Sequence, residues 1–302
     1  MSKLLLVDGS ALLHRAYHAY PPLTSKTGEV VGAVYGVTSI LISALDSEKP
    51  SHAMVAWDLP KPTFRHVKYV GYKAQRPKAD AEMVEQIPLV KEMIEAMGIV
   101  QVEKEGFEAD DIIGTLSKNQ DGDVVILTGD QDTMQLVNDH VRILTPAKGA
   151  NPPVLYGPDQ VFNKYGVHPG QIVDYKALIG DPSDNIPGVA GVGPKGAANL
   201  IKMFGSLERI YRDIKEVQVH FGELMAKKIA DGKESAFLSQ DLSRIVTDMK
   251  LSVQTEEMKY MGLQGQSLKV KLEELGFKSL VKRIYGEENQ RTKESKNQMG
   301  LF

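Results

Sequence analysis

The residues best suited to chemistry in this sequence are acidic side chains that follow apolar runs. Asp8 ends the run LLLVD, Asp58 ends AMVAWD, and Asp130 and Asp132 follow VVILT. In open α/β sheets, ligands bind at the carboxyl ends of parallel strands. We therefore expect these carboxylates to meet at one edge of a sheet, although each alone would also suit a turn or a helix N-cap.

Further acids crowd into two short motifs. The stretch GFEADDIIGTL at 106–116 carries Glu108, Asp110 and Asp111, and GDPSDN carries Asp181 and Asp184. One acid would be enough to cap a helix. Carboxylates gathered in one cleft would repel each other by several kcal/mol even at an effective dielectric constant of about 20. Hard divalent cations, Mg²⁺ above all, would relieve that repulsion.

Two such ions about 4 Å apart would polarise a phosphodiester and stabilise its leaving oxygen. The pattern therefore predicts a metal-dependent nuclease or phosphatase, with scattered structural acids as the alternative. A rival zinc site at His14 and His18 has no third histidine, no HExxH motif and no cysteine to complete it.

Runs rich in Leu, Val and Ile supply the elements that would position these acids. Strands are predicted at 3–7, 52–57, 123–127 and 141–144, with helical periods between them, which indicates β-α-β units and a mostly parallel sheet. One helical period runs from Met83 to Met97, and Pro88 is expected to kink or restart it. After about residue 168 the sequence predicts helices only. From 286 to 297 no residue is apolar, which predicts a flexible tail.

Bulk composition narrows the chemistry further. The 302 residues contain no cysteine, so any metal must be held by oxygen or histidine, and the absence of thiols suits a cytoplasmic protein. No apolar run reaches about 18 residues, so no membrane span is expected. The net charge of −3 gives no sign of a polyanion partner.

A local basic stretch does indicate a polyanion partner. Residues 59–79 hold six basic side chains and no acidic one, interleaved with Phe64, Tyr69 and Tyr72. Cations with aromatic rings suit single-stranded or frayed nucleic acid, where stacking contributes about 1–3 kcal/mol per base. A solvated loop is the alternative. The basic residues are Lys61, Arg65, Lys68, Lys73, Arg76 and Lys78.

The glycine-rich stretch NIPGVAGVGPKGAANL formally matches G-x-G-x-x-G between Gly191 and Gly196. A turn sequence precedes it in place of a strand, and Pro194 separates Gly193 from Lys195, so neither a dinucleotide fingerprint nor a Walker loop fits. Two helices joined by a tight hairpin, with backbone N–H groups facing a phosphate, suit it better. An ordinary turn between helices is the alternative.

Taken together and in this order, the motifs VDGSALLHRAYHA, FRHVKYVGYKAQRP, EADDIIGTL, TGDQD and GDPSDNIPGVAGVGPKGAANL resemble the flap endonuclease, or 5′ nuclease, family over about residues 3–285. The resemblance implies an α/β fold: a PIN-like nuclease core with a helical arch at 1–168. A helix-hairpin-helix DNA-binding domain at 169–285 and a tail at 286–302 would follow.

The resemblance also implies roles for individual residues. Lys73 and Arg76 match arch residues that approach the scissile phosphate, Tyr72 matches an aromatic that stacks on the unpaired 5′ nucleotide, and Arg15 matches a basic residue near the site. The hairpin would bind DNA through Gly188, Gly191, Gly193 and Lys195. Two Mg²⁺ ions, replaceable by Mn²⁺, would be held by Asp8, Asp58, Glu108, Asp110 and Asp111 in one cluster and by Asp130, Asp132, Asp181 and Asp184 in the other. A K⁺ ion at the hairpin is a further family feature.

Two positions depart from the family pattern. Trp57 precedes Asp58 where the family often has phenylalanine, and Gln131 stands where the family often has the lysine of GDKD. The second departure removes a positive charge beside the second cluster, which leaves the occupancy of that cluster open.

The last five residues, QMGLF, resemble the peptide by which bacterial replication proteins dock on the β sliding clamp, through Gln298, Leu301 and Phe302. An apolar chain end without function is the alternative. We therefore expect a monomeric, stand-alone 5′ nuclease that cuts branched DNA at 5′ flaps and 5′ ends. A DNA-binding scaffold recruited to the clamp and a PIN-type ribonuclease are the rival functions.

Overall fold

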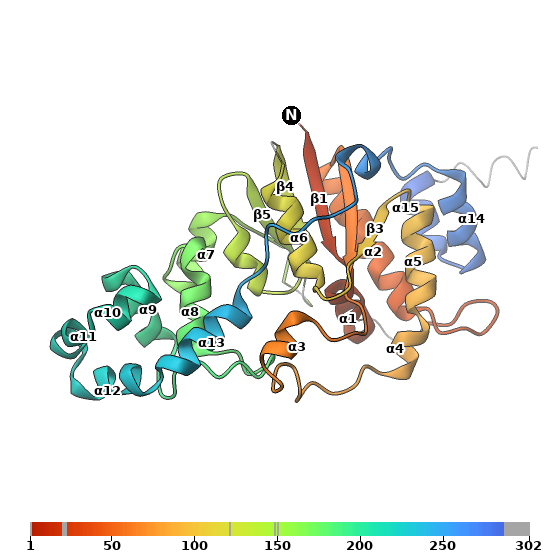
Figure 1. Cartoon of the computed structure of the whole chain (residues 1–302). Helices are drawn as coiled ribbons and strands as arrows, with labels where there is room; N and C mark the ends of the chain where they lie inside the picture. The colour runs from red at the N-terminus through yellow and green to blue at the C-terminus, as the bar shows by residue number, and fades with distance from the viewer. Residues whose placement is uncertain (1, 20–22, 121, 148, 150, 287–302) are drawn as a thin grey trace, which may run out of the picture. The chain divides into compact units, whose positions relative to one another are not determined.

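The computed structural model describes residues 2–19, 23–120, 122–147, 149 and 151–286 (Figure 1). These residues form two compact units. The first takes the described residues within 1–11, 55–78 and 102–252, and the second those within 12–54, 79–101 and 253–302. The division does not fall at residue 168, so the domain boundary expected there stays a prediction. Most of the expected tail lies outside the described residues.

A six-stranded sheet runs in the order β3-β2-β1-β4-β5-β6. β1 pairs with β4 and β4 with β5 in parallel, whereas β6 pairs with β5 antiparallel, so the predicted mostly parallel sheet is confirmed. All four expected strands are present, and the two that the sequence did not reveal are the short ones, β3 and β6. The strands are β1 Lys3–Asp8, β2 His52–Trp57, β3 Val100–Glu103, β4 Asp123–Leu127, β5 Val141–Thr145 and β6 Val154–Tyr156.

Burial explains why the central strands read as unbroken apolar runs. Leu5 and Leu6 on β1 and Ile126 on β4 have no exposed surface. A strand covered on both faces needs apolar residues at successive positions instead of alternating ones. The polar residues are therefore left at the strand ends, which is where the acids appear.

The first unit also holds most of the helices. In Figure 1, α8 and α13 lie side by side, and α9 to α12 gather beyond them on the side away from β1, β4 and β5. The predicted helical C-terminal region is thereby confirmed. The elements are α3 Phe64–Lys68, α6 Ala109–Lys118, η1 Asp132–Leu136, α7 Pro158–Tyr165, η2 Pro169–Gln171, α8 Ile172–Ile179, α9 Pro194–Phe204, α10 Leu207–Arg212, α11 Ile214–Phe221, α12 Glu223–Asp231 and α13 Lys233–Ser243.

The second unit packs α2 against α5 and α5 against α14. Pro88 restarts the helical period as expected: α4 ends at Glu85 and α5 begins at Ile87, with the proline in its first turn, where no N–H is needed. None of the helices in the described ranges combines the length and apolarity that a bilayer crossing requires. The remaining elements are α1 Gly9–Ala19, which starts in the first unit, α2 Gly32–Glu48, α4 Ala81–Glu85, α5 Ile87–Ala96, η3 Thr255–Met258, α14 Gln266–Glu274 and α15 Lys278–Tyr285.

Candidate active site

All nine acids singled out from the sequence lie in the first unit. Asp8 ends β1 and caps α1, because its Oδ1 accepts a hydrogen bond from the N–H of Ala11 at 2.9 Å. Its Oδ2 accepts from the hydroxyl of Thr128, just past the end of β4, at 2.8 Å. The same hydroxyl accepts from the N–H of Asp130 at 2.9 Å. One buried threonine therefore joins the ends of the two paired strands.

The end of β2 is tied to the start of α6. Asp58 Oδ1 accepts from the N–H of Ala109 at 2.8 Å, and the N–H of Asp58 donates to Ser10 Oγ at 3.0 Å. These bonds bring the first turn of α6, with Glu108 and Asp110, to the strand ends. Asp58 therefore lies beside the start of α6, while the convergence of the acids on one ion stays a prediction.

Electrostatics within this group favour a cation. Burial raises the pKa of Asp8 to about 7, and the negative charges of Asp58 and Asp130 add to the rise. Burial also raises the pKa of Asp110 well above its usual value, with Asp130 and Asp8 as the next causes. Asp110 Oδ1 is buried and has no hydrogen-bond partner. A buried oxygen acceptor without a donor, among other acids, is the donor chemistry that a hard divalent ion uses.

Asp111 has a different environment from its neighbours. Its carboxylate receives two hydrogen bonds of 2.8 Å from Arg65, one of 2.9 Å from the N–H of Val246 and one of 3.1 Å from the N–H of Glu108. The last bond is half of a capping box on α6. Both of its oxygens are thus engaged by protein donors.

The acids of the second cluster are arranged by two tight turns. The N–H of Asp132 donates to Asp130 Oδ1 at 2.8 Å, at the start of η1. Asp181 and Ile186 exchange backbone hydrogen bonds of 2.9 and 2.8 Å and close the loop that carries Asp184. Burial raises the pKa of Asp130, while the nearby Lys176 opposes the rise.

Gly180 and Gly188 form the base of this loop. Both have positive φ angles, +73° and +64°, and a Cβ on Gly180 would lie 2.5 Å from the carbonyl oxygen of Ile186. A Cβ on Gly188 would lie 2.3 Å from the nitrogen of Gly180. The two backbones can cross this closely only because neither residue has a side chain.

Lys176 is the cation that sequence reasoning missed. Its Nζ forms ion pairs with Asp132 and, at 2.7 Å, with Asp181. Burial would raise the pKa of Asp181, but Lys176 and the N–H and hydroxyl of Ser183 hold it below its usual value. The sequence offered one clue, a lysine on the helix that leads directly into GDPSDN.

Two cations of the basic stretch, Lys73 and Arg76, form ion pairs with the acids. Lys73 Nζ lies 3.0 Å from Glu108, and Arg76 forms an ion pair with Asp184. The backbone N–H of Lys73 donates to the carbonyl of Asp184 at 2.9 Å, with Lys73 itself at a φ of +54°. Residues 69–76 form successive turns in place of the regular helix that would put Tyr72 and Arg76 one turn apart.

Tyr72 is buried and packs against Ile186 and Leu242. Its hydroxyl donates to Glu108 at 3.1 Å and lies 3.3 Å from Asp184. In this conformation its ring has no free face, so the stacking role inferred from the family requires the side chain to leave this position. That role stays a prediction.

Ion pairs with basic side chains separate several of the acids from one another. Within the described residues, no three His, Asp or Glu side chains converge as ligands of one ion. Lys73, Arg76 and Lys176 lie between the carboxylates and neutralise several of them. The rings of His14 and His18, the rival zinc site, pack against each other with centroids 4.8 Å apart.

The hairpin residues divide into two kinds. Gly188 donates its N–H to Ser239 Oγ at 2.9 Å, and its carbonyl accepts from Ser235, so its backbone groups are engaged within the protein. Gly193 precedes α9 and, like Gly191 and Lys195, is exposed. An exposed helix start with a lysine in its first turn can hold a phosphate.

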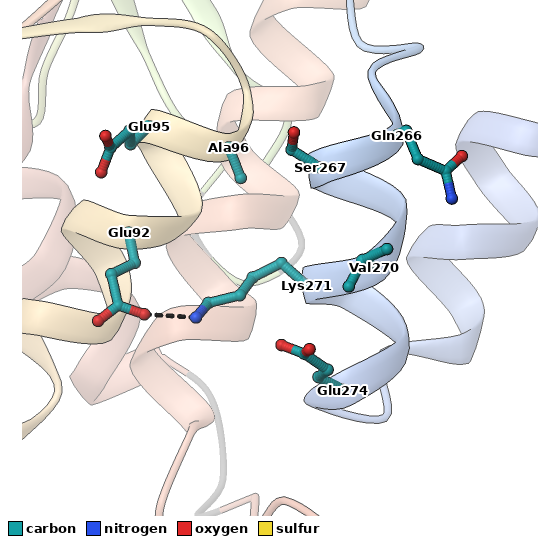
Figure 2. Close-up of a pocket in the computed structure, with 8 residues that line it drawn as sticks. All are labelled: Glu92, Glu95, Ala96, Gln266, Ser267, Val270, Lys271 and Glu274. Atoms are coloured by element: carbon teal, nitrogen blue, oxygen red, sulfur yellow. Dashed lines mark hydrogen bonds and ion pairs between the residues drawn. The ribbon is translucent and has the colours of Figure 1, made fainter.

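Two groups of predicted residues do not belong to the first unit. Arg15 belongs to the part of α1 in the second unit and is partly buried, so its role stays a prediction. Gln298, Leu301 and Phe302 fall outside the described residues. The second unit has a groove of its own, of about 760 Å³, between α5 and α14 (Figure 2). An ion pair between Glu92 and Lys271 spans it, and none of the predicted site residues lines it.

Comparison with known proteins gives consistent results along the chain. Residues 3–166 match the family model of the 5′-3′ exonuclease N-terminal resolvase-like domain, and residues 167–266 match that of the 5′-3′ exonuclease C-terminal SAM fold. The chain is 38% identical over 287 residues to a 5′-3′ exonuclease of Aquifex aeolicus, covering 94% of this chain and 96% of that one. It is 41% identical over 285 residues to DNA polymerase I of Bacillus subtilis, covering 93% of this chain and 32% of the polymerase. The match thus spans about a third of the polymerase relatives.

Solved structures share the fold. The 5′-exonuclease of phage T5 with bound zinc matches with a TM-score of 0.67 at 24% identity, over 81% of this chain and 90% of that one. The phage T5 D15 flap endonuclease in a complex with DNA and metal ions matches with a TM-score of 0.66 at 20% identity, over 94% and 98%. At these identities the likeness shows the fold alone.

Proposed function

The chain belongs to the 5′-3′ exonuclease family, and from this premise we propose that it is a structure-specific 5′ nuclease acting on flaps and 5′ ends of branched DNA. Removal of RNA primers and DNA repair are the processes that such cuts serve. The observation that carries the proposal is the group of acids at the strand ends and the start of α6, in which Asp8 is buried and the buried Oδ1 of Asp110 has no donor. Such a group is stable as a set of anions only when cations accompany it.

The donor set suits two Mg²⁺ ions, with Mn²⁺ as a substitute. Asp8, Asp58, Glu108 and Asp110 would hold one ion, and Asp130, Asp132, Asp181 and Asp184 the other. Bound there, such ions polarise a phosphodiester and lower the pKa of attacking water. We assign Asp111 to the positioning of α6, because Arg65 bonds to both of its oxygens and already balances its charge.

The remaining roles fall to cations and backbone groups of the chain. Once the carboxylates are neutralised, Lys73 and Arg76 are free to face the scissile phosphate and to stabilise the charge that develops on it. The hairpin around Gly191, Gly193 and Lys195 would hold the duplex by its phosphates without reading bases. A K⁺ ion at the hairpin would have to share the carbonyl of Gly191 with Lys228 Nζ, which donates to it at 3.1 Å.

A labelled 5′-flap DNA tests the proposal. We expect cleavage in Mg²⁺, none in EDTA, and a loss of at least a thousandfold in Asp110→Asn with flap binding retained. Asp159→Asn, which changes an exposed acid in the first turn of α7, is the matched control and should cut normally. Cleavage that persists in EDTA or in Asp110→Asn would refute the assignment.

The same substrates separate the rival functions. A scaffold without nuclease activity would leave the flap intact in Mg²⁺, and a ribonuclease would prefer single-stranded RNA to the DNA flap. The family favours neither, because both of its domains are matched in this chain.

The finer expectations need separate measurements. Docking of the tail on the β sliding clamp is tested by titrating a peptide of residues 287–302 against a bacterial clamp, with Leu301 and Phe302 replaced by alanine as the control. Sedimentation of the full chain tests the monomeric state, and fractionation of cells tests the cytoplasmic location.

A further inference from the structure

Lys176 lies where the second acidic cluster is most enclosed. It belongs to the last turn of α8, which ends when the N–H of Gly180 donates to the carbonyl of Lys176 at 2.8 Å. The chain then turns at once into Asp181, whose carboxylate returns to Lys176 Nζ at 2.7 Å. The side chain of Lys176 is only 12% exposed. The ammonium group of Lys176 therefore has a fixed, largely buried position.

The cavity around this lysine has a volume of about 450 Å³ and is lined by Asp130, Asp132 and Asp181. Among the described residues that line it, Lys176 is the only basic one. Gln131 also lines the cavity but adds no charge, and its Oε1 accepts from the hydroxyl of Tyr165 at 2.5 Å. One ammonium thus faces three carboxylates.

The first cluster presents a contrast. There, Lys73 pairs with Glu108 at 3.0 Å, but Asp110 Oδ1 is buried without a donor, so a divalent ion can take that oxygen without displacing a protein group. In the second cluster, Asp132 and Asp181 already share an ammonium, and an arriving ion must break both ion pairs or bind beside a like charge. Like charges a few ångströms apart in a partly buried site repel strongly.

We propose that Lys176 is the resident cation of Asp132 and Asp181 in the second cluster and sets the concentration of divalent ion at which that cluster fills. The inference rests on the proposed function for the presence of two ions and adds their order: the first cluster fills at low concentration, the second only after Lys176 is displaced. A released Lys176 ammonium also becomes available to a phosphate in the same cavity. This division makes the second ion the one whose supply limits the enzyme.

Calorimetric titration of the full chain with Mn²⁺, without DNA, tests the proposal directly. We expect one tighter and one weaker site in the natural protein. In Lys176→Met the weaker site should tighten at least tenfold, while the tighter site changes little. Lys176→Arg keeps the charge and should keep the weak site. Lys202→Met removes an exposed lysine from α9 in the same unit and is the matched control for net charge.

Each outcome decides the matter. A weaker site of unchanged affinity in Lys176→Met, or a single site in both proteins, would overturn the role of Lys176 while leaving the nuclease proposal intact. If the natural protein bound no Mn²⁺ at all, the nuclease proposal itself would be overturned. Should Lys176→Met fold poorly, Lys176→Gln and the rise of its melting temperature with Mn²⁺ give the same comparison, and a rise no larger than that of the natural protein would count against Lys176.

Discussion

Arg65 and Asp111 form a buried ion pair with two parallel hydrogen bonds, both 2.8 Å long. Arg65 also donates to the carbonyls of Leu242 and Arg244, at 2.9 and 2.8 Å. The pair therefore joins three segments that are distant in sequence: α3, the start of α6 and the chain that leaves α13. Asp110 and Asp111 are adjacent in sequence but differ in their hydrogen bonds: Oδ1 of Asp110 has no donor, whereas both oxygens of Asp111 accept from Arg65.

Breaking this pair should destabilise the protein. Asp111→Ala leaves a buried guanidinium without its partner, which costs about 3–5 kcal/mol, and Arg65→Met leaves the reverse defect. Chemical denaturation measures both. Asp110→Ala is the neighbouring control and should unfold no more easily than the natural protein, because it removes an acid whose buried Oδ1 lacks a donor. Equal losses for Asp110→Ala and Asp111→Ala would contradict the assignment of separate roles.

The pH dependence of stability should show the buried acids. Asp8 has a pKa of about 7 in the fold against 3.8 as its ordinary value, so the folded state holds its proton more tightly than the unfolded chain. Stability of the metal-free protein should therefore fall as pH rises from about 4 to about 7 and then level off. Asp8→Asn removes this loss.

We expect Asp8→Asn to gain on the order of 2 kcal/mol over the natural protein at pH 8 and little at pH 4. Thermal unfolding in EDTA at the two pH values measures the difference. Asp139→Asn, which changes an exposed aspartate in the turn before β5, should show no such trend. A gain that is the same at both pH values would contradict the burial of a charged Asp8.

Lys73 and Arg76 should matter for turnover more than for substrate binding. Lys73→Met and Arg76→Met each remove a positive charge that is held near the carboxylates, and loss of one preorganised donor costs about a hundredfold to a thousandfold in kcat. Lys78→Met removes an exposed cation of the same stretch and should change kcat little. Flap cleavage at saturating substrate measures the effect. If KM rose and kcat were unchanged, the two residues would be binding groups only.

The glycine crossing beneath the second cluster should tolerate no side chain. Gly180→Ala introduces a Cβ at 2.5 Å from the carbonyl oxygen of Ile186 and at a positive φ, for an expected loss of about 2–4 kcal/mol. It should also weaken the second Mn²⁺ site, since the loop with Asp181 and Asp184 must shift. Gly170→Ala meets no atom within 4 Å and is the control. Similar melting temperatures for the two variants would contradict the close crossing.

The sequence was sufficient for the features that follow from local patterns. Asp8, Asp58 and Asp130 were expected together because each follows a strand, and parallel strands end at one edge. The partners of Asp111 could not be predicted in this way, since Arg65 lies 46 positions away and was read only as part of a basic stretch. The role of Lys176 could not be predicted for a similar reason, because its contact with Asp181 depends on where α8 ends. Tyr72 was expected to face a nucleotide, and its burial depends on Ile186 and Leu242 from distant segments.

The hydroxyl of Thr128 donates to Asp8 and accepts from the N–H of Asp130, and the residue has no exposed surface. The hydroxyl oxygen of Thr128 thus contacts one acid of each cluster. Asp8 and Asp130 cannot move apart without straining a hydrogen bond to Thr128, so the pairing of β1 with β4 sets their spacing. If the two clusters each hold an ion as proposed, the distance between the ions is therefore set when β1 pairs with β4.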